Sequence, residues 1–158
     1  MLALLALMVT ACGDSKATTT TSPGVDCEEP PDEEQVSQLD LTLDPNPVVS
    51  GAVAQLAMTR GDLPDDAVIG VDAWWQCWAS GEWVTTHVVY RGFGDNPGQS
   101  IPVNDDFQIQ VPDIGLTLDA GYPIAIPQVE PGMYRIEDAV FLQDGQLEGF
   151  VLVEVIDS

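Results

Sequence analysis

The sequence predicts an all-β domain, a two-sheet β-sandwich, over residues 39–158. Three observations lead to this prediction: apolar and polar residues alternate in short runs, proline and glycine separate the runs, and no stretch keeps a helical period for three turns. Seven or eight such runs follow one another, and this regular spacing favours a sandwich over a helical or mixed fold.

The first predicted strand contains Leu39, Leu41 and Leu43, which alternate with polar residues and so give one buried and one wet face. Pro45 and Pro47 end it, because proline cannot donate to a sheet ladder. The other predicted strands are 54–58, 69–78, 82–90, 107–111, 122–126, 134–141 and 150–156, with a tight turn at 80–81.

Residues 1–11 predict an export signal, because the apolar run that begins at Leu2 is far shorter than the ~20 residues of a membrane-spanning helix. Its end, Val9-Thr10-Ala11-Cys12, resembles the lipobox of bacterial lipoproteins. The resemblance implies cleavage before Cys12 and diacylglycerol on its thiol, so that the protein is lipid-anchored at the bacterial cell membrane and faces outside the cytoplasm. No basic residue precedes the run, so we expect the natural start to lie upstream of Met1.

Residues 12–38 predict a lipidated cysteine followed by a flexible acidic tether. This segment holds a threonine run, two proline-containing turns and five acidic residues between 28 and 34. Such a composition cannot bury enough apolar surface to order itself. The segment is therefore expected to hold the domain away from the membrane.

The chain is strongly acidic, with 26 Asp and Glu against 4 Lys and Arg and a formal net charge of -22. Nucleic acid is excluded as a partner, because binding it requires basic groups that displace counterions from phosphate. Anionic lipid headgroups should also repel the domain. Solubility is the simplest account of this charge.

Three segments resemble bacterial immunoglobulin-like domains of surface lipoproteins. The run 41–51, LTLDPNPVVSG, is similar to their first strand and its proline-glycine corner, and the run 80–84, SGEWV, is similar to their central hairpin. The run 131–135, PGMYR, resembles the entry to their penultimate strand. The resemblance spans residues 39–156 and implies an immunoglobulin-like sandwich without catalytic residues. Cys27 and Cys77 do not occupy the strands that the antibody disulfide joins, which argues against an antigen-receptor analogy.

Cys27 and Cys77 are the two thiols that remain once Cys12 is lipidated, and outside the cytoplasm we expect a disulfide between them. This bond would attach the tether to the sandwich. Two unpaired thiols or a redox pair are the alternatives, but no closely spaced dithiol motif supports redox catalysis.

Tryptophans are concentrated in the predicted strand 69–78. Strand alternation places Trp75 on the same face as Cys77 and makes it the expected core tryptophan. Trp74 and Trp78 then lie on the outer face, where they could stack on a sugar or bind a protein. Cover by a loop, or by a tail attached through Cys77, is the alternative.

No catalytic constellation, metal cluster or cofactor loop has usable spacing, so we expect no enzyme, no cofactor and no metal. His87 is the single histidine and is expected to be a strand-pairing residue. Oxygen-rich loops at Asp62, Asp65 and Asp66 and at residues 104–106 could hold calcium, although the ordered ligand pattern of a calcium loop is missing.

The sequence therefore predicts a non-enzymatic surface lipoprotein that presents its domain for binding or cell-envelope interaction, with an envelope protein or a glycan as partner. Two alternatives remain open. One is a carbohydrate-binding accessory that uses Trp74 and Trp78, and the other is a calcium-dependent adhesion domain.

Overall fold

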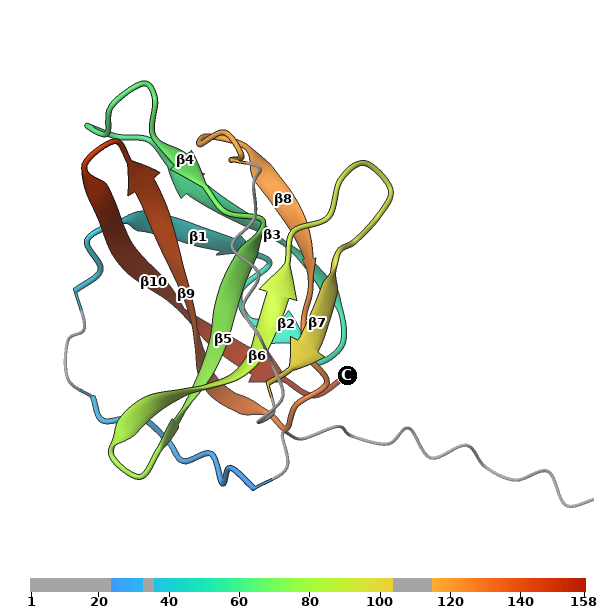
Figure 1. Cartoon of the computed structure of the whole chain (residues 1–158). Helices are drawn as coiled ribbons and strands as arrows, with labels where there is room; N and C mark the ends of the chain where they lie inside the picture. Colours follow the sequence, from blue (N-terminus) through green and yellow to red (C-terminus); the bar gives the residue numbers. More distant parts are fainter. Residues whose placement is uncertain (1–23, 33–35, 104–114) are drawn as a thin grey trace, which may run out of the picture.

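The computed structural model describes residues 24–32, 36–103 and 115–158, and in these ranges ten strands and no helix form two packed sheets (Figure 1). The prediction of an all-β, two-sheet fold is confirmed. The smaller sheet has the order β1-β3-β8, formed by β1 (Asp40–Asp44), β3 (Val53–Thr59) and β8 (Gly121–Ala125). Its strands are antiparallel, and Leu41 lies opposite Met58.

The larger sheet has the order β2-β10-β9-β5-β6-β7, with β4 paired to β9 as well. Its strands are β2 (Val48–Val49), β4 (Val68–Ile69), β5 (Asp72–Ala79), β6 (Glu82–Tyr90), β7 (Gln99–Pro102), β9 (Gly132–Leu142) and β10 (Gly145–Ile156). Only the β2–β10 pair is parallel among the described pairs.

The core fills the space between the sheets because each strand directs alternate side chains inward. Trp75 on β5 is its largest fully buried side chain, and its ring packs 5.2 Å from that of Tyr134. Leu56 and Ile124 of the smaller sheet and Ile136 of the larger one are also fully buried. Trp75 is therefore the core tryptophan, as the alternation along its strand predicted.

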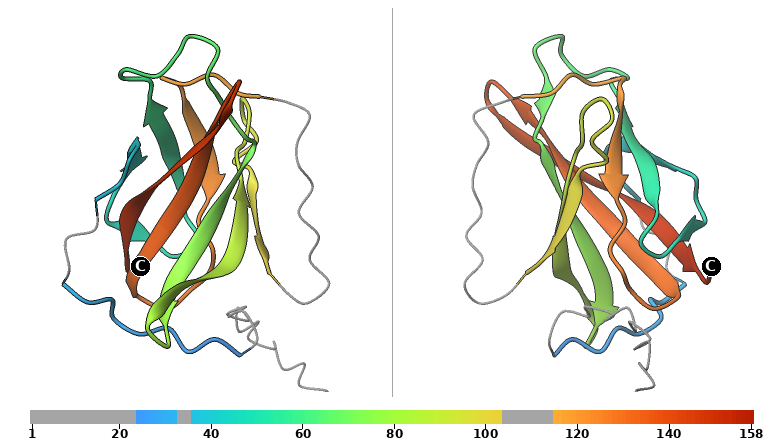
Figure 2. Two further views of the ribbon diagram at one scale, coloured as in Figure 1. Left: turned by 60° about the vertical axis from the view of Figure 1, so that its left-hand side comes forward. Right: turned by 90° about the vertical axis from the view of Figure 1, so that its right-hand side faces the viewer.

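A β-bulge in β6 interrupts this alternation. Trp75 pairs with His87 and the next residue of β5, Gln76, pairs with Thr85, so Thr86 is the extra residue. Four consecutive residues of β6, from Thr86 to Val89, are buried. The end of the sandwich that carries the β5–β6 turn and the β8–β9 connection is called here the basal end (Figure 2).

Two local backbone features explain how the chain turns and crosses itself. Ser80 and Gly81, between β5 and β6, both have positive φ, of 53° and 87°, which the two-residue turns of hairpins require. Gly149 on β10 lies directly under the segment that enters β1, where an added Cβ would come within 2.5 Å of Leu39. The Ser37 hydroxyl there accepts a hydrogen bond from the backbone N–H of Phe150, at 2.9 Å.

The predicted strands match the observed ones at β1, β3, β6, β8, β9 and the second half of β10. The predicted strand 69–78 is divided into β4 and β5, while β2 and β7 were not predicted. The predicted strand 107–111 lies outside the described residues.

Residues 24–32, part of the predicted tether, run along the basal end beside the β5–β6 hairpin (Figure 2). The backbone N–H of Glu28 donates to the carbonyl of Trp78 at 2.8 Å, and Val25 packs against the core. Cys27 forms a disulfide with Cys77, with a Cα–Cα distance of 5.6 Å. The disulfide agrees with the prediction, and it joins this segment to β5.

Arg91, just after β6, forms a fully buried ion pair with Asp138 of β9. Its guanidinium also donates to the carbonyl of Gly70, at 2.8 Å, and to that of Asp72, at 3.1 Å. Burial raises the pKa of Asp138, and the charge of Arg91 opposes this by lowering it. Through these contacts the pair connects the end of β6, the start of β5, the middle of β9 and the β4–β5 connection.

Replacing this arginine should leave a buried, uncompensated carboxyl group. We expect Arg91→Met to lower the free energy of unfolding by about 3–5 kcal/mol at pH 7, measured by urea denaturation. Without Arg91 the pKa of Asp138 rises further above its unfolded value, so the variant should regain stability as pH falls and lose it as pH rises through that pKa. Arg60→Met, which removes an exposed pair with Asp119, is the control and should cost about 1 kcal/mol or less. Equal losses in the two variants would contradict this role for Arg91.

Candidate functional site

The outer face of the larger sheet carries a group of large rings around one arginine, called here the aromatic face: Trp74, Trp78, Trp83, Phe150 and Arg135. The strand order brings them together, because β5 lies between β6 and β9, and β10 follows β9. All four rings are partly exposed. Trp74 and Trp78 thus lie on the outer face of β5, where the sequence placed them.

Direct contacts link four of these side chains, those of Trp78, Trp83, Arg135 and Phe150. The rings of Trp78 and Trp83, opposite one another on β5 and β6, meet edge to face with centroids 5.6 Å apart. The guanidinium carbon of Arg135 lies 4.9 Å from the centroid of Trp83 and 5.1 Å from that of Phe150. One cation therefore bridges rings from two distant hairpins.

A line of polar groups crosses the aromatic face beneath the rings. Arg135 donates from Nε to Oε1 of Gln76, at 2.7 Å, and from Nη2 to Oε2 of Glu137, at 2.8 Å. Gln76 in turn donates to Oγ1 of Thr85, at 3.2 Å. Burial lowers the pKa of Arg135, while Glu137 raises it. The charge of the arginine is thus locally balanced, and two hydrogen bonds orient its side chain.

A polar groove of about 540 Å³ continues the aromatic face beyond Phe150. Its lining includes Gln38 from the segment before β1, Glu137 from β9, and Gln146 and Glu148 from β10. Amide and carboxylate oxygens therefore lie next to an aromatic ring.

The second hollow is a pocket of about 580 Å³ at the basal end, called here the basal pocket. Three chain segments line it: residues 25–29 of the attached tail, Thr86 and His87 at the β6 bulge, and residues 129–134 between β8 and β9.

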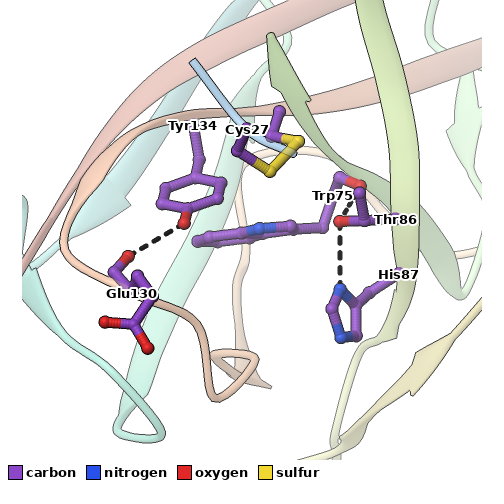
Figure 3. Close-up of a disulfide and its surroundings, with 7 residues drawn as sticks. Cys27, Trp75, Thr86, His87, Glu130 and Tyr134 are labelled. Atoms are coloured by element: carbon purple, nitrogen blue, oxygen red, sulfur yellow. Dashed lines mark hydrogen bonds between the residues drawn. A yellow bond between two sulfur atoms is a disulfide. The ribbon is translucent and has the colours of Figure 1, made fainter. Parts of the chain in front are cut away.

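Hydrogen bonds join several of the residues around the disulfide (Figure 3). The hydroxyl of Tyr134 donates to the carbonyl of Glu130 at 2.8 Å, and Oγ1 of Thr86 lies 3.1 Å from Nδ1 of His87. Burial raises the pKa of Tyr134, and Glu130 raises it further. His87, predicted to be a pairing residue, pairs with Trp75 and also lines this pocket.

Other predicted sites are separate from these two surfaces. Asp62, Asp65 and Asp66 are exposed on the loop between β3 and β4. Among the described residues no three His, Cys, Asp or Glu side chains are grouped closely enough to hold a metal ion. Cys12 and residues 104–106 lie outside the described residues. Within the described ranges no helix has the length and apolar character needed to cross a membrane.

Arg135, Phe150 and the basal pocket were not predicted as site residues. The composition did single out Arg135, because it is one of only four Lys and Arg residues in a chain of net charge -22. In such a chain each of these residues is expected to pair with a carboxylate. The basal pocket gave no local signal, because its three segments are far apart in the sequence.

No protein-family model, no curated protein and no solved structure matches this chain. The arrangement of its own residues is therefore the basis for assigning a function.

The disulfide should hold one wall of the basal pocket in place. We expect Cys27→Ala to lower the free energy of unfolding by roughly 4 kcal/mol, because the bond closes a loop with a sequence separation of 50. Cys27 is exposed, so its replacement opens no cavity in the core. Thermal melts with and without reductant provide the control: reductant should lower the melting temperature of the wild type and leave that of Cys27→Ala unchanged. A wild-type melt that does not respond to full reduction would contradict this role.

Proposed function

We propose that this chain is a non-enzymatic lipoprotein of the bacterial envelope, whose immunoglobulin-like sandwich binds an envelope partner through the aromatic face. The anchor part of the proposal is supported by the sequence Val9-Thr10-Ala11-Cys12 and the short apolar run before it. The immunoglobulin-like part is supported by the antiparallel pairing of most strands and by a buried tryptophan on a central strand.

The aromatic face is the observation that carries the binding proposal. Tryptophan and arginine are enriched among the residues that dominate binding energy at protein interfaces. Trp78, Trp83 and Arg135 hold one another in fixed positions, so little side-chain freedom remains to be lost when a partner binds. Such a surface on one side of a strongly acidic domain suits recognition of another envelope molecule.

A glycan is the second candidate partner, and the groove beside Phe150 favours it. Sugar rings stack their apolar faces on aromatic side chains, and their hydroxyls need hydrogen-bond acceptors nearby. Glu137, Gln146 and Glu148 supply such acceptors next to the ring. A neutral glycan also avoids the repulsion that an anionic polymer would meet on this acidic domain.

Removing the tryptophans should separate the candidate partners. We expect Trp74→Ala and Trp78→Ala each to reduce retention on isolated envelope fragments by about tenfold, because they remove stacking area from the aromatic face. The same variants on a glycan array test the carbohydrate candidate: retained glycans should be lost with the tryptophans.

Phe93→Ala is the matched control for these variants. Phe93 is 53% exposed and lies on the β6–β7 connection, away from the aromatic face. If Phe93→Ala lost binding as much as Trp78→Ala, the proposed surface would be wrong. Retention on the envelope with no signal for any glycan would rule out the carbohydrate candidate and favour a protein partner.

The anchor has its own test. Mature wild-type protein should begin at Cys12 and carry the mass of its acyl groups, since the thiol accepts the diacylglycerol. Cys12→Ala should abolish both the modification and partitioning into detergent, as measured by mass spectrometry and phase separation. Unchanged partitioning of the variant, or a wild-type mass without acyl groups, would exclude the lipoprotein assignment.

A further inference from the structure

The basal pocket combines apolar walls with charges of one sign. Val25, Val129, Pro131 and Met133 supply apolar surface, and Tyr134 supplies a ring. Carboxylates surround this surface on Asp26, Glu28, Glu29 and Glu130, all of which are exposed. Thr86 and His87, both buried, supply polar atoms at the inner end.

Within the described ranges, no arginine lines this pocket. The three that are described lie elsewhere and each has its own carboxylate: Arg60 pairs with Asp119, Arg91 with Asp138 and Arg135 with Glu137. Four carboxylates around one opening therefore create a negative potential that none of these arginines balances.

We infer that the basal pocket binds a small organic cation with an apolar body, such as an alkylammonium ion. The apolar part would lie against Val129 and Met133, and the positive charge would lie near Glu29 and Glu130. The negative potentials of the four carboxylates around the opening add together, so they attract a cation more strongly than one carboxylate would. The ring of Tyr134 offers further stabilisation of the cation.

The size and position of the pocket favour a small molecule over a polymer. Its volume of about 580 Å³ is within the range of small-molecule sites. One wall is the tail segment fixed by the Cys27–Cys77 disulfide, so the site is largely formed before the ligand enters. It is separate from the aromatic face, so this inference does not depend on the function proposed above.

Three probes of matched size test the inference: hexylammonium, 1-hexanol and hexanoate. Each is titrated into the full chain with its disulfide intact and with Cys12→Ala, which removes any acyl group that could compete. Binding is followed by amide shifts in ¹H–¹⁵N NMR spectra. We expect hexylammonium to shift the amides of His87, Gly132 and Tyr134 saturably, with an affinity about tenfold above that of 1-hexanol, while hexanoate binds more weakly than both.

Charge removal at the opening provides the second measurement. The double variant Glu29→Gln/Glu130→Gln should lower the affinity for hexylammonium by about tenfold and leave that for 1-hexanol unchanged, because only the charged probe loses a partner. Both residues are exposed, so the fold should persist. The control Asp65→Asn/Asp66→Asn removes two charges from a loop that does not line the pocket and should change neither affinity.

Two results would overturn the inference. The first is equal affinity for hexylammonium and 1-hexanol, which would mean that the carboxylates do not favour a charged ligand over a neutral one. The second is a set of shifts spread over the whole acidic surface and equally reduced in the Asp65→Asn/Asp66→Asn control, which would mean non-specific attraction of cations.

Discussion

The alternation of side chains along β5 is the constraint on which the rest of the structure depends. This strand lies between β9 and β6 in the larger sheet, so both of its edges are hydrogen-bonded to neighbouring strands. Its inward residues Trp75 and Cys77 fill the core and form the disulfide, while Trp74, Gln76 and Trp78 face outward. A register slip of one residue would exchange the two sets, exposing the core tryptophan and burying the polar row. The core, the disulfide and the aromatic face therefore depend on one register.

The bulge in β6 lies next to the basal pocket. Thr86 is the extra residue in the register of β6 with β5, so the residues that follow it are shifted by one position relative to those before it. Thr86 and His87 are both buried, and both line the basal pocket. The tail that Cys27 fixes closes the opposite wall. The basal pocket is thus lined both by the residues at the bulge and by the segment that the disulfide attaches.

The sequence predicted those features that depend on short-range alternation. The leucines of β1 and the burial of Trp75 follow from a period of two residues, and the start of β6 follows from the turn at Ser80-Gly81. β2 has only two residues and β7 only four, which is too short for a period to be read. The contacts of Arg135 were not predictable in this way, because its hydrogen bond to Gln76 joins residues 59 positions apart. Such contacts depend on which distant strands pair, and the residues next to Arg135 in the sequence do not indicate this pairing.

The three described arginines show how an acidic chain uses its few cations. Arg91 neutralises a carboxyl group inside the protein, Arg60 lies near Asp119 at the surface, and Arg135 is balanced by Glu137. The aromatic face is thus close to electrically neutral at its centre, although the protein around it is strongly negative. A neutral partner can approach such a face without crossing a charged barrier, whereas an anionic polymer would be repelled by the surrounding carboxylates. The position of Arg135 therefore orders the rings and, if the proposed binding surface is correct, would favour a neutral partner over an anionic one.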